Sequence, residues 1–386
     1  MKSTKTYAGI AILSSGFLLT GCGGSQATDM TGYASQPNSF NQPLSTATSM
    51  SASTLGAKLL PIQGKPTFIA GTELSSVSGT PDHEFGRASA SSTDSAYSPK
   101  GVTSALQDVA GFGVNVVRLT AFKHLDGLKL DANGVVTGLD DVFVKNLTDL
   151  VGKAESSKLQ IYLTLSSPWQ GSPAKNPITD TAARTAFLKN AVSPLMAKLR
   201  GRASVMAVGI LGQVEAEVAG KDGNGTDKGA TWEQARDYIK SCTDFIKSVD
   251  SSRLVTAGSG LHGAQNLKAG KLSRLGLDFY DFQTYDDSGL LPSVKELRVD
   301  RPVILGACGP KSTKVDGDLQ AKADVAFLTN AVQQGYAGAF VGDYSKDSAN
   351  PMALLDKDGK HRPVCAQLQT FVANLPMMSS ASTSSK

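Results

Sequence analysis

The stretch PVILGACGP, from Pro302 to Pro310, contains a short apolar run, residues 303–306, that ends at a glycine. Such a run predicts a buried strand that stops at a turn. Seven more runs of this kind occur along the chain, and each is continuously apolar, as in parallel strands that helices cover. They lie at residues 67–71, 114–120, 160–165, 205–211, 254–257, 279–284 and 337–342.

Amphipathic helical patterns alternate with these eight runs. They cover residues 99–111, 140–156, 180–199, 231–249, 262–275, 291–297, 317–334 and 362–374. Asp180 and Thr231 suit the N-cap position, and residues 231–234 have the form of a capping box. Eight strand-helix alternations predict an α/β protein with a (β/α)8 TIM barrel. A doubly wound open sheet is the alternative, but no GxGxxG motif follows the first strand.

The chain begins with the features of an export signal. Lys2 and Lys5 precede an apolar stretch, residues 7–19, that is too short to span a bilayer. Residues 19–22 read Leu-Thr-Gly-Cys and resemble the lipobox of bacterial lipoproteins, in which cleavage precedes the cysteine and acyl chains modify it. We therefore expect residues 1–21 to be a lipoprotein signal peptide and Cys22 to carry a stable membrane anchor. The alternative is a signal peptide that ends at a chance cysteine.

The residues after the cysteine bear on localisation and domain boundaries. Position 23 is glycine rather than the aspartate that retains such lipoproteins at the inner membrane, so we expect the cell envelope, at the outer membrane. Residues 23–57 and 377–386 are polar and bury too little apolar area to offset the entropy lost on ordering. We therefore predict a disordered linker at residues 22–57, the barrel at residues 58–376 and a disordered tail at residues 377–386.

Charge and cysteine content exclude other classes of function. The formal net charge is +4 and no basic block occurs, so nucleic-acid binding has no support. Cys242, Cys308 and Cys365 could form one disulfide and one thiol, or remain as three buried thiols. There is no CxxC motif and no histidine cluster, so we expect neither a metal site nor a cofactor. Nothing in the sequence indicates an oligomeric state.

Four stretches resemble, in the same order, segments of the retaining cellulase-like glycoside hydrolases of family 5 and their clan relatives. Residues 113–119, GVNVVRL, are similar to the GxNxVR pattern of the family's second strand. Residues 231–259 resemble its fourth helix and fifth strand, residues 278–285 its sixth strand and residues 301–306 its seventh. The resemblance implies a (β/α)8 barrel and a glycan ligand. Retaining chemistry in such a barrel needs two carboxylates roughly 5 to 5.5 Å apart.

The resemblance also implies that this catalytic pair has been lost. The family's nucleophile ends strand seven in a Gly-Glu-Phe/Tyr-Gly motif, and residues 306–309 place Ala307 at that position. Alanine can neither attack an anomeric carbon nor stabilise an oxocarbenium ion. Glu215 is the best match to the acid/base that ends strand four in Asn-Glu-Pro, while Gln213 and Glu217 are the alternatives in other registers.

Other positions of the family's site are partly retained. On strand six Tyr285 is kept, but Gln283 stands where the family has histidine, and strand eight lacks its usual tryptophan. In the family, the residue that matches Arg118 supports the nucleophile by a charge-assisted hydrogen bond. Since a buried arginine without a partner is costly, we expect another acid to serve it here, either Glu73 or Asp343.

Two alternatives would preserve catalysis. Cys308 could act as a thiolate nucleophile, although no histidine is near it in sequence; the other interpretation is a buried, inert cysteine. An inverting mechanism could instead pair Glu215 with a more distant carboxylate, since such pairs lie roughly 6.5 to 9.5 Å apart. The candidates for that second carboxylate are Glu73, Asp286 and Asp343.

Glycan binding without hydrolysis is less affected by the loss of the catalytic residues. Such binding needs aromatic faces and planar polar side chains rather than two matched carboxylates. Trp169, just after strand three, is either a stacking platform or a residue that pins its loop to a helix. Asp286 could bind a sugar hydroxyl but also suits an ordinary turn. The predicted ligand-binding set is Glu73, Arg118, Trp169, Gln283, Tyr285, Asp286 and Asp343.

These observations together predict an exported, lipid-anchored protein that binds a polysaccharide without hydrolysing it, or that acts as a scaffold in the cell envelope. One alternative is an active endoglucanase-like hydrolase that uses Glu215 with a relocated carboxylate. The other alternative is a structural lipoprotein without a glycan ligand.

Overall fold

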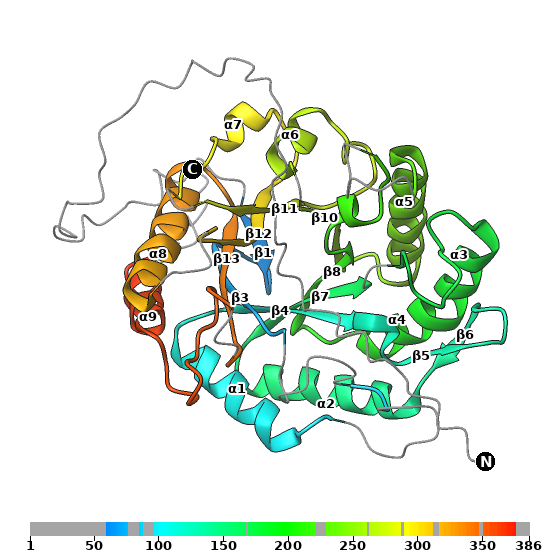
Figure 1. The fold of residues 1–386 in the computed structure, drawn as a ribbon, viewed down its shortest axis with the longest axis horizontal. Coiled ribbons are helices and arrows are strands. Elements are labelled where there is room, and N and C mark those ends of the chain that lie inside the picture. The colour runs from blue at the N-terminus through cyan, green and yellow to red at the C-terminus, as the bar shows by residue number, and fades with distance from the viewer. Residues whose placement is uncertain are drawn as a thin grey trace, which may run out of the picture. The chain divides into compact units, whose positions relative to one another are not determined.

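Nine parallel strands form the central sheet of the protein. A computed structural model describes residues 59–75, 85–87, 96–166, 169–220, 229–260, 262–286, 289–311, 316–346 and 350–375. The strand order is β10-β11-β12-β13-β3-β4-β7-β8-β9. Because only Ala257 separates β9 from β10, these two form one interrupted strand that joins the two ends of the sheet. Helices surround the resulting barrel (Figure 1), and the predicted (β/α)8 fold is confirmed.

The observed barrel strands follow the predicted runs closely. The run at residues 205–211 forms β8 as predicted, and most of the others end nearer to the C-terminus than expected. The predicted signal peptide, the lipidation site at Cys22, the linker and the tail all lie outside the described residues. The barrel strands are β3 (Ile69–Glu73), β4 (Val116–Phe122), β7 (Gln160–Ser166), β8 (Val205–Leu211), β9 (Leu254–Thr256), β10 (Gly258–Ser259), β11 (Tyr280–Tyr285), β12 (Val303–Gly309) and β13 (Gly338–Asp343).

Strand β12 differs from its prediction in a way that matters for the site. The expected turn at Gly306 is wrong, because the strand continues to Gly309 and contains Ala307. Gly306 serves another purpose: a Cβ atom there would overlap the carboxylate of Asp281 on the neighbouring strand β11. The glycine therefore makes room for a buried acid inside the barrel rather than ending the strand.

The helices form where the capping signals and amphipathic patterns place them. Asp180 accepts a 2.9 Å hydrogen bond from the amide of Ala183, and Thr231 forms the predicted capping box with Gln234. The predicted helix at residues 262–275 is shorter than expected, because Gly270 adopts a φ of 72° after its end. The helices are α1 (Pro99–Gly111), α2 (Asp141–Ser156), α3 (Thr181–Phe187), α4 (Ser193–Leu199), α5 (Trp232–Val249), α6 (Gly263–Lys268), α7 (Val294–Leu297), α8 (Gly317–Gln333) and α9 (Pro363–Ala373), with a π-helical turn, Leu188–Val192, joining α3 to α4.

Two hairpins were not predicted from the sequence. The first pairs β1 (Leu60–Ile62) with β2 (Lys65–Thr67), and it places Leu60 in a buried cluster with Ile69 and Val116 at the entry to the barrel strands. The second pairs β5 (Leu128–Leu130) with β6 (Val136–Leu139). Both strands of the first hairpin contain proline, which argues against a strand when the sequence is considered alone.

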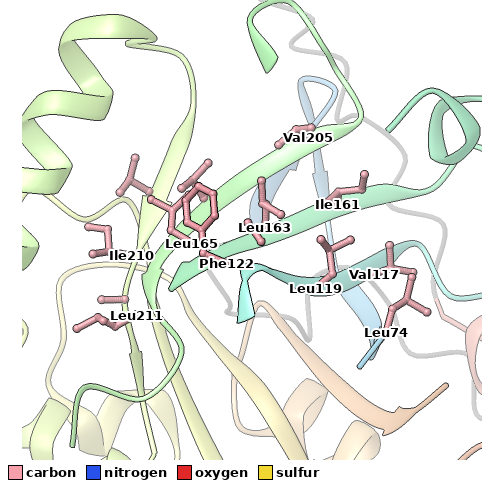
Figure 2. Packing of buried hydrophobic residues seen from close by; sticks show 14 of the residues in the cluster. Leu74, Val117, Leu119, Phe122, Ile161, Leu163, Leu165, Val205, Ile210 and Leu211 are labelled. Carbon is pink, nitrogen blue, oxygen red and sulfur yellow. The ribbon is translucent and has the colours of Figure 1, made fainter. Parts of the chain in front are cut away.

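Alternate residues of the barrel strands divide between two apolar layers. Residues such as Val117, Leu119, Ile161 and Leu163 pack in the layer between the strands and the helices, as Figure 2 shows. Their neighbours in sequence point to the opposite face, because successive side chains of a strand alternate. The side chain of Arg118 on β4 therefore lies inside the barrel. Within the part of the chain that the structure describes, no helix is both long and apolar enough to span a membrane.

Candidate functional site

A buried charged group occupies the interior of the barrel near its mouth. Arg118 is only 3% exposed, and its Nη1 atom donates a 2.7 Å hydrogen bond to the carbonyl oxygen of Gly306. The guanidinium lies 5.2 Å from the ring centroid of Tyr162, whose hydroxyl donates a 2.6 Å hydrogen bond to Asp281. Arg118, Tyr162 and Asp281 therefore form one network that joins β4, β7, β11 and β12.

Asp281 is the acid that balances the charge of Arg118. Burial on its own would lower the pKa of Arg118, but the charge of Asp281 raises it, and Glu73 adds to the same effect. Burial raises the pKa of Asp281, and Arg118 offsets part of that shift. The sequence prediction named Glu73 or Asp343 for this role and missed Asp281. The missed signal is the alternation of Asp281, Gln283 and Tyr285, which puts all three on one face of β11.

Ala307, at the position where the resemblance implies the nucleophile, is part of this interior wall. Ala307 is buried and pairs with Gln283 in the parallel register between β11 and β12. Cys308 is also buried, and burial raises the pKa of its thiol well above the usual value. Burial and this shift disfavour a thiolate nucleophile and favour the inert-cysteine interpretation. Cys242 and Cys365 are likewise free and buried, so the three-thiol alternative holds.

Glu215 is held within the wall of the barrel. It lies in the turn Val214–Ala216 after β8, and its Oε2 atom accepts a 2.7 Å hydrogen bond from the amide of Gly260. Its Oε1 atom accepts hydrogen bonds from Ser259 and Asn266. Burial raises its pKa, while these donors oppose the shift. Glu215 therefore fixes the segment between β10 and α6, and its partner Gly260 lies beside Gln213, because a Cβ atom at Gly260 would be 2.9 Å from the Gln213 side chain.

Glu217 and Trp169 form a second structural unit. Glu217 accepts hydrogen bonds of 2.6 Å and 3.2 Å from the amides of Trp169 and Gln170, and burial raises its pKa to about 7. The side chain of Trp169 is 1% exposed, and its ring lies 5.0 Å from that of Phe187 in an edge-to-face arrangement. This burial counts against the stacking-platform prediction for Trp169 and favours the alternative, a residue that pins its loop to a helix.

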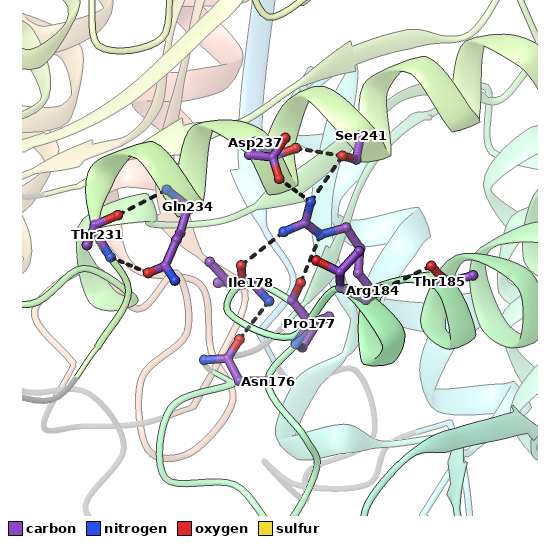
Figure 3. A network of polar contacts seen from close by, with 10 residues as sticks. Asn176, Pro177, Ile178, Arg184, Thr185, Thr231, Gln234, Asp237 and Ser241 are labelled. Atoms are coloured by element: carbon purple, nitrogen blue, oxygen red, sulfur yellow. Dashed lines mark hydrogen bonds and ion pairs between the residues drawn. The ribbon is translucent and has the colours of Figure 1, made fainter.

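The same loop is fixed further along by Arg184 of α3. Its Nε and Nη2 atoms each donate a 3.0 Å hydrogen bond, to the carbonyl oxygens of Pro177 and Ile178 respectively. Its Nη1 atom binds Asp237 of α5, as Figure 3 shows. The segment between β7 and α3 is thus fixed at both ends, by Glu217 and by Arg184.

Gln213 connects β8 to β11 over the interrupted strand β9/β10, which lies between them. It is exposed, and its Nε2 atom donates a 2.7 Å hydrogen bond to the side-chain oxygen of Gln283. Gln283 in turn donates to the carbonyl oxygen of Gly212 at 3.2 Å, and the Tyr285 hydroxyl donates to Gln283 at 3.3 Å. Among the three candidate registers after β8, Gln213 is the one whose side chain bonds directly to the side chain of Gln283.

Two acids meet at the ends of adjacent strands. Glu73 pairs with Asp343 in the register between β3 and β13. Asp343 accepts hydrogen bonds from the amide and hydroxyl of Ser75, at 3.1 Å and 2.7 Å, and from Asn350 at 2.9 Å. Burial raises its pKa to about 6, and Glu73 contributes to the shift. Glu73 is only partly buried, and its charge also acts on Arg118 and on the Tyr285 hydroxyl, so it lies near both.

Backbone hydrogen bonds fix the position of Asp286. It is exposed directly after β11, its amide donates to the carbonyl oxygen of Gly309 at 3.1 Å, and its own carbonyl accepts from Gly289. These backbone contacts support the turn interpretation. The mouth therefore presents two amides, one phenol and one acid, which together can donate and accept hydrogen bonds to hydroxyl groups: Gln213, Gln283, Tyr285 and Glu73. No group of three or more metal-ligating side chains occurs among the described residues.

The barrel and its polar mouth define a protein with a glycoside hydrolase-like fold. No family model matches the chain. In sequence it is similar to the mannan endo-1,4-β-mannosidase of Mytilus edulis, with 23% identity over 252 residues that cover 53% of this chain and 67% of that enzyme. This similarity and the structures below bear out the predicted resemblance to cellulase-like glycoside hydrolases at the level of the fold.

Three solved structures illustrate the likeness. The β-mannanase of Mytilus edulis has a TM-score of 0.59 and 17% identity, covering 81% of this chain and 92% of its own. The β-1,4-D-mannanase of Cryptopygus antarcticus has a TM-score of 0.57 and 19% identity, with coverages of 79% and 96%. An exo-β-1,4-mannosidase from Opitutaceae bacterium strain TAV5 has a TM-score of 0.64 and 15% identity, with coverages of 85% and 63%.

Proposed function

We propose that this protein binds a β-linked polysaccharide without cleaving it. The observation that carries the proposal is the fate of the two catalytic positions: Ala307 has no carboxylate, and Glu215 is bound by Ser259, Gly260 and Asn266. Cleavage by a retaining mechanism requires an acid and a nucleophile on opposite sides of the glycosidic bond. Hydrogen bonding to hydroxyl groups requires neither.

The ligand that we propose is a β-1,4-linked mannan or a related oligosaccharide. The support is the set of mannan-active enzymes whose barrels resemble this one. Gln213 and Gln283 offer amide donors and acceptors, and Glu73 offers a carboxylate acceptor. Tyr285 is 43% exposed, so its ring can cover the apolar face of a sugar while its hydroxyl stays bonded to Gln283.

The proposal is tested by affinity electrophoresis in gels that contain soluble β-mannan. We expect the wild-type protein to be retarded and Gln283→Ala to migrate as it does in a gel without polysaccharide. Gln369→Ala is the matched control, because Gln369 is an exposed glutamine on α9. Absence of retardation for the wild type would favour the structural-lipoprotein alternative, and release of reducing ends by the purified wild type would favour a hydrolase.

A second candidate function is hydrolysis by an inverting mechanism with Asp343 and Glu73. The observation in its favour is that Glu73 and Asp343 are register partners at the ends of adjacent strands, and that burial raises the pKa of Asp343 to about 6. The hydrogen bonds from Ser75 and Asn350 to Asp343 count against it. The product anomer, followed by NMR, would be inverted, and Asp343→Asn would abolish its formation.

We also propose that acyl chains on Cys22 anchor the protein in the cell envelope, at the outer membrane. The support is the lipobox-like sequence at residues 19–22 and the glycine at position 23. Metabolic labelling with a radioactive fatty acid should mark the wild type and leave Cys22→Ala unlabelled. An unlabelled wild type would contradict the anchor without affecting the proposal on glycan binding.

A further inference from the structure

The loops that precede the barrel strands carry a strong excess of positive charge. We call them the N-terminal face, because they lie at the ends of the strands opposite the mouth. They contain three acidic residues, which are Asp250, Asp278 and Asp300. Their cationic residues are Lys65, Lys158, Arg200, Arg202, Arg253, Lys271, Arg274, Arg298 and Arg301.

Each of the three acids already has a cationic partner. Asp250 binds Arg253 at 3.1 Å, Asp278 binds Lys247 at 2.7 Å, and Asp300 lies 3.7 Å from Arg301. Arg202 is paired as well, with Glu155 of α2 at 3.0 Å, so three of the nine cations have an acidic partner, namely Arg202, Arg253 and Arg301. Lys65, Lys158, Arg274 and Arg298 are all exposed, and within the described residues none of these four forms an ion pair.

Three of these cationic residues adopt a left-handed backbone conformation that usually favours glycine or asparagine. Lys158, Arg274 and Arg298 have φ angles of 59°, 62° and 53°, in the left-handed region. Lys158 follows the C-cap of α2, and Arg298 is the C-cap of α7. Helices usually place glycine or asparagine in this conformation, since a Cβ atom is strained there. A helix end also attracts cations, which is a purely structural explanation that an experiment must separate from a binding role.

The chain enters the barrel from the same face. Strand β1 begins at Leu60, which packs with Ile69, Val116 and Tyr162 at the start of the barrel strands, and β1 lies within the ring of strands in Figure 1. Any anchor that precedes Leu59 is therefore joined to the protein at the cationic face. The mouth, with Gln213 and Gln283, lies at the opposite ends of the strands.

We propose that the N-terminal face docks on an anionic lipid surface and turns the mouth away from the bilayer. Guanidinium and ammonium groups bind the phosphates of lipid headgroups, and a cluster of them adds up to a substantial attraction. The orientation relative to the bilayer rests on the lipid anchor proposed above, whereas the attraction to anionic lipid does not. A bound polysaccharide would then be held on the side that faces away from the membrane.

Vesicle co-sedimentation tests this docking. The full chain with Cys22→Ala is the parent, so that acylation does not contribute, and residues before the barrel are identical in all variants. The face variant combines Lys65→Gln, Lys158→Gly and Arg298→Gly. The control variant removes the same charge from the loop after β13 by Lys346→Gln, Lys357→Gln and Lys360→Gln, all of them exposed. Vesicles contain phosphatidylcholine with or without phosphatidylglycerol.

We expect the parent and the control variant to bind the phosphatidylglycerol vesicles equally, and the face variant to bind them about tenfold or more weakly. Salt should weaken the parent's binding, because counterions screen the attraction. Lys158→Gly and Arg298→Gly should leave the melting temperature unchanged or raise it. That result would mean that these cations are not needed to stabilise the helix ends, which separates docking from the structural explanation.

Equal binding by the face and control variants would overturn the proposal, as would binding of the parent that does not depend on phosphatidylglycerol. Loss of retention on an acidic polysaccharide such as polygalacturonate, with unchanged vesicle binding, would also overturn it and would assign the face to a glycan. Retardation in β-mannan gels is measured on the same variants. It should be the same for all of them, so a failure of docking is distinguishable from a failure of the proposed glycan binding.

Discussion

The side-chain amide of Gln213 donates a 2.7 Å hydrogen bond to the side-chain oxygen of Gln283, and this bond joins the ends of β8 and β11 over the interrupted strand β9/β10 that lies between them. Both groups are neutral at every accessible pH, and both lie where the family resemblance would place groups of a catalytic site. Amides that bind hydroxyl groups differ from an acid/base pair because amides do not titrate. The contribution of Gln213 and Gln283 to ligand affinity should therefore not change with pH.

Restoring a carboxylate at the nucleophile position should not restore hydrolysis. In Ala307→Glu the new acid would have no free arginine, because Arg118 is bound to Gly306 and balanced by Asp281. Glu215 would also remain bound by Ser259 and Asn266. We expect no release of reducing ends from β-mannan, and a melting temperature lower than that of the wild type, since an acid is placed in a buried wall. Measurable cleavage by this single variant would contradict the account.

Removing Asp281 should destabilise the barrel strongly. Asp281→Asn removes the main counter-charge of Arg118 inside the barrel, and the loss of one partner costs about 3 to 5 kcal/mol in comparable buried pairs. Tyr162→Phe removes a single hydrogen bond to the same acid, and we expect about 1 kcal/mol. Urea unfolding followed by fluorescence gives both values. Asp244→Asn is the control, because its ion pair with Lys240 is exposed. A similar loss for Asp281→Asn and Asp244→Asn would rule out the buried pair as a major contribution.

The raised pKa of Asp343 predicts the sign of one pH dependence. Its pKa is about 6 in the folded protein and 3.8 as the ordinary value, so the folded state holds the proton more tightly. The stability from this group is fully present below pH 4 and is lost as the pH rises through about 6. The free energy of unfolding of the wild type should therefore fall relative to that of Asp343→Asn between these values. A difference that stays constant over this range would mean that Asp343 is not shifted.

The two aromatic residues near the mouth should respond in opposite ways. Trp169→Ala removes a buried ring that packs on Phe187, so we expect a loss of about 3 to 5 kcal/mol in stability. Tyr285→Ala removes an exposed ring and should reduce glycan affinity with little change in stability. Thermal unfolding and binding calorimetry on both variants separate the effects. A folded Trp169→Phe variant with reduced affinity for mannan would show that Trp169 reaches the ligand after all.

The sequence was sufficient for the fold, because its information on strands and caps is local. Continuous apolar runs predict parallel strands, and Asp180 and Thr231 cap their helices as expected. The hairpin of β1 and β2 was not predicted, because its prolines resemble those of a linker. The hairpin packs on Ile69 and Val116, which lie on the barrel strands β3 and β4. Contacts with other strands leave no local signal in the sequence of the hairpin.

The site was only partly predictable. Gln283, Tyr285, Arg118 and Glu73 lie where strand ends place them, since alternation fixes the face of a residue within a strand. Glu215 follows a strand in a tight turn, where spacing does not fix the direction of a side chain, and its three hydrogen-bond donors come from residues 259–266.

The central claim is that the mouth of this barrel holds a glycan intact. An NMR titration of a β-1,4-manno-oligosaccharide with the wild-type protein measures binding and cleavage in the same sample. The account predicts saturable broadening of the ligand signals, no new reducing-end signal after prolonged incubation, and loss of the broadening in Gln283→Ala but not in Gln369→Ala. New reducing-end signals with the wild type, or a complete absence of broadening, would contradict it.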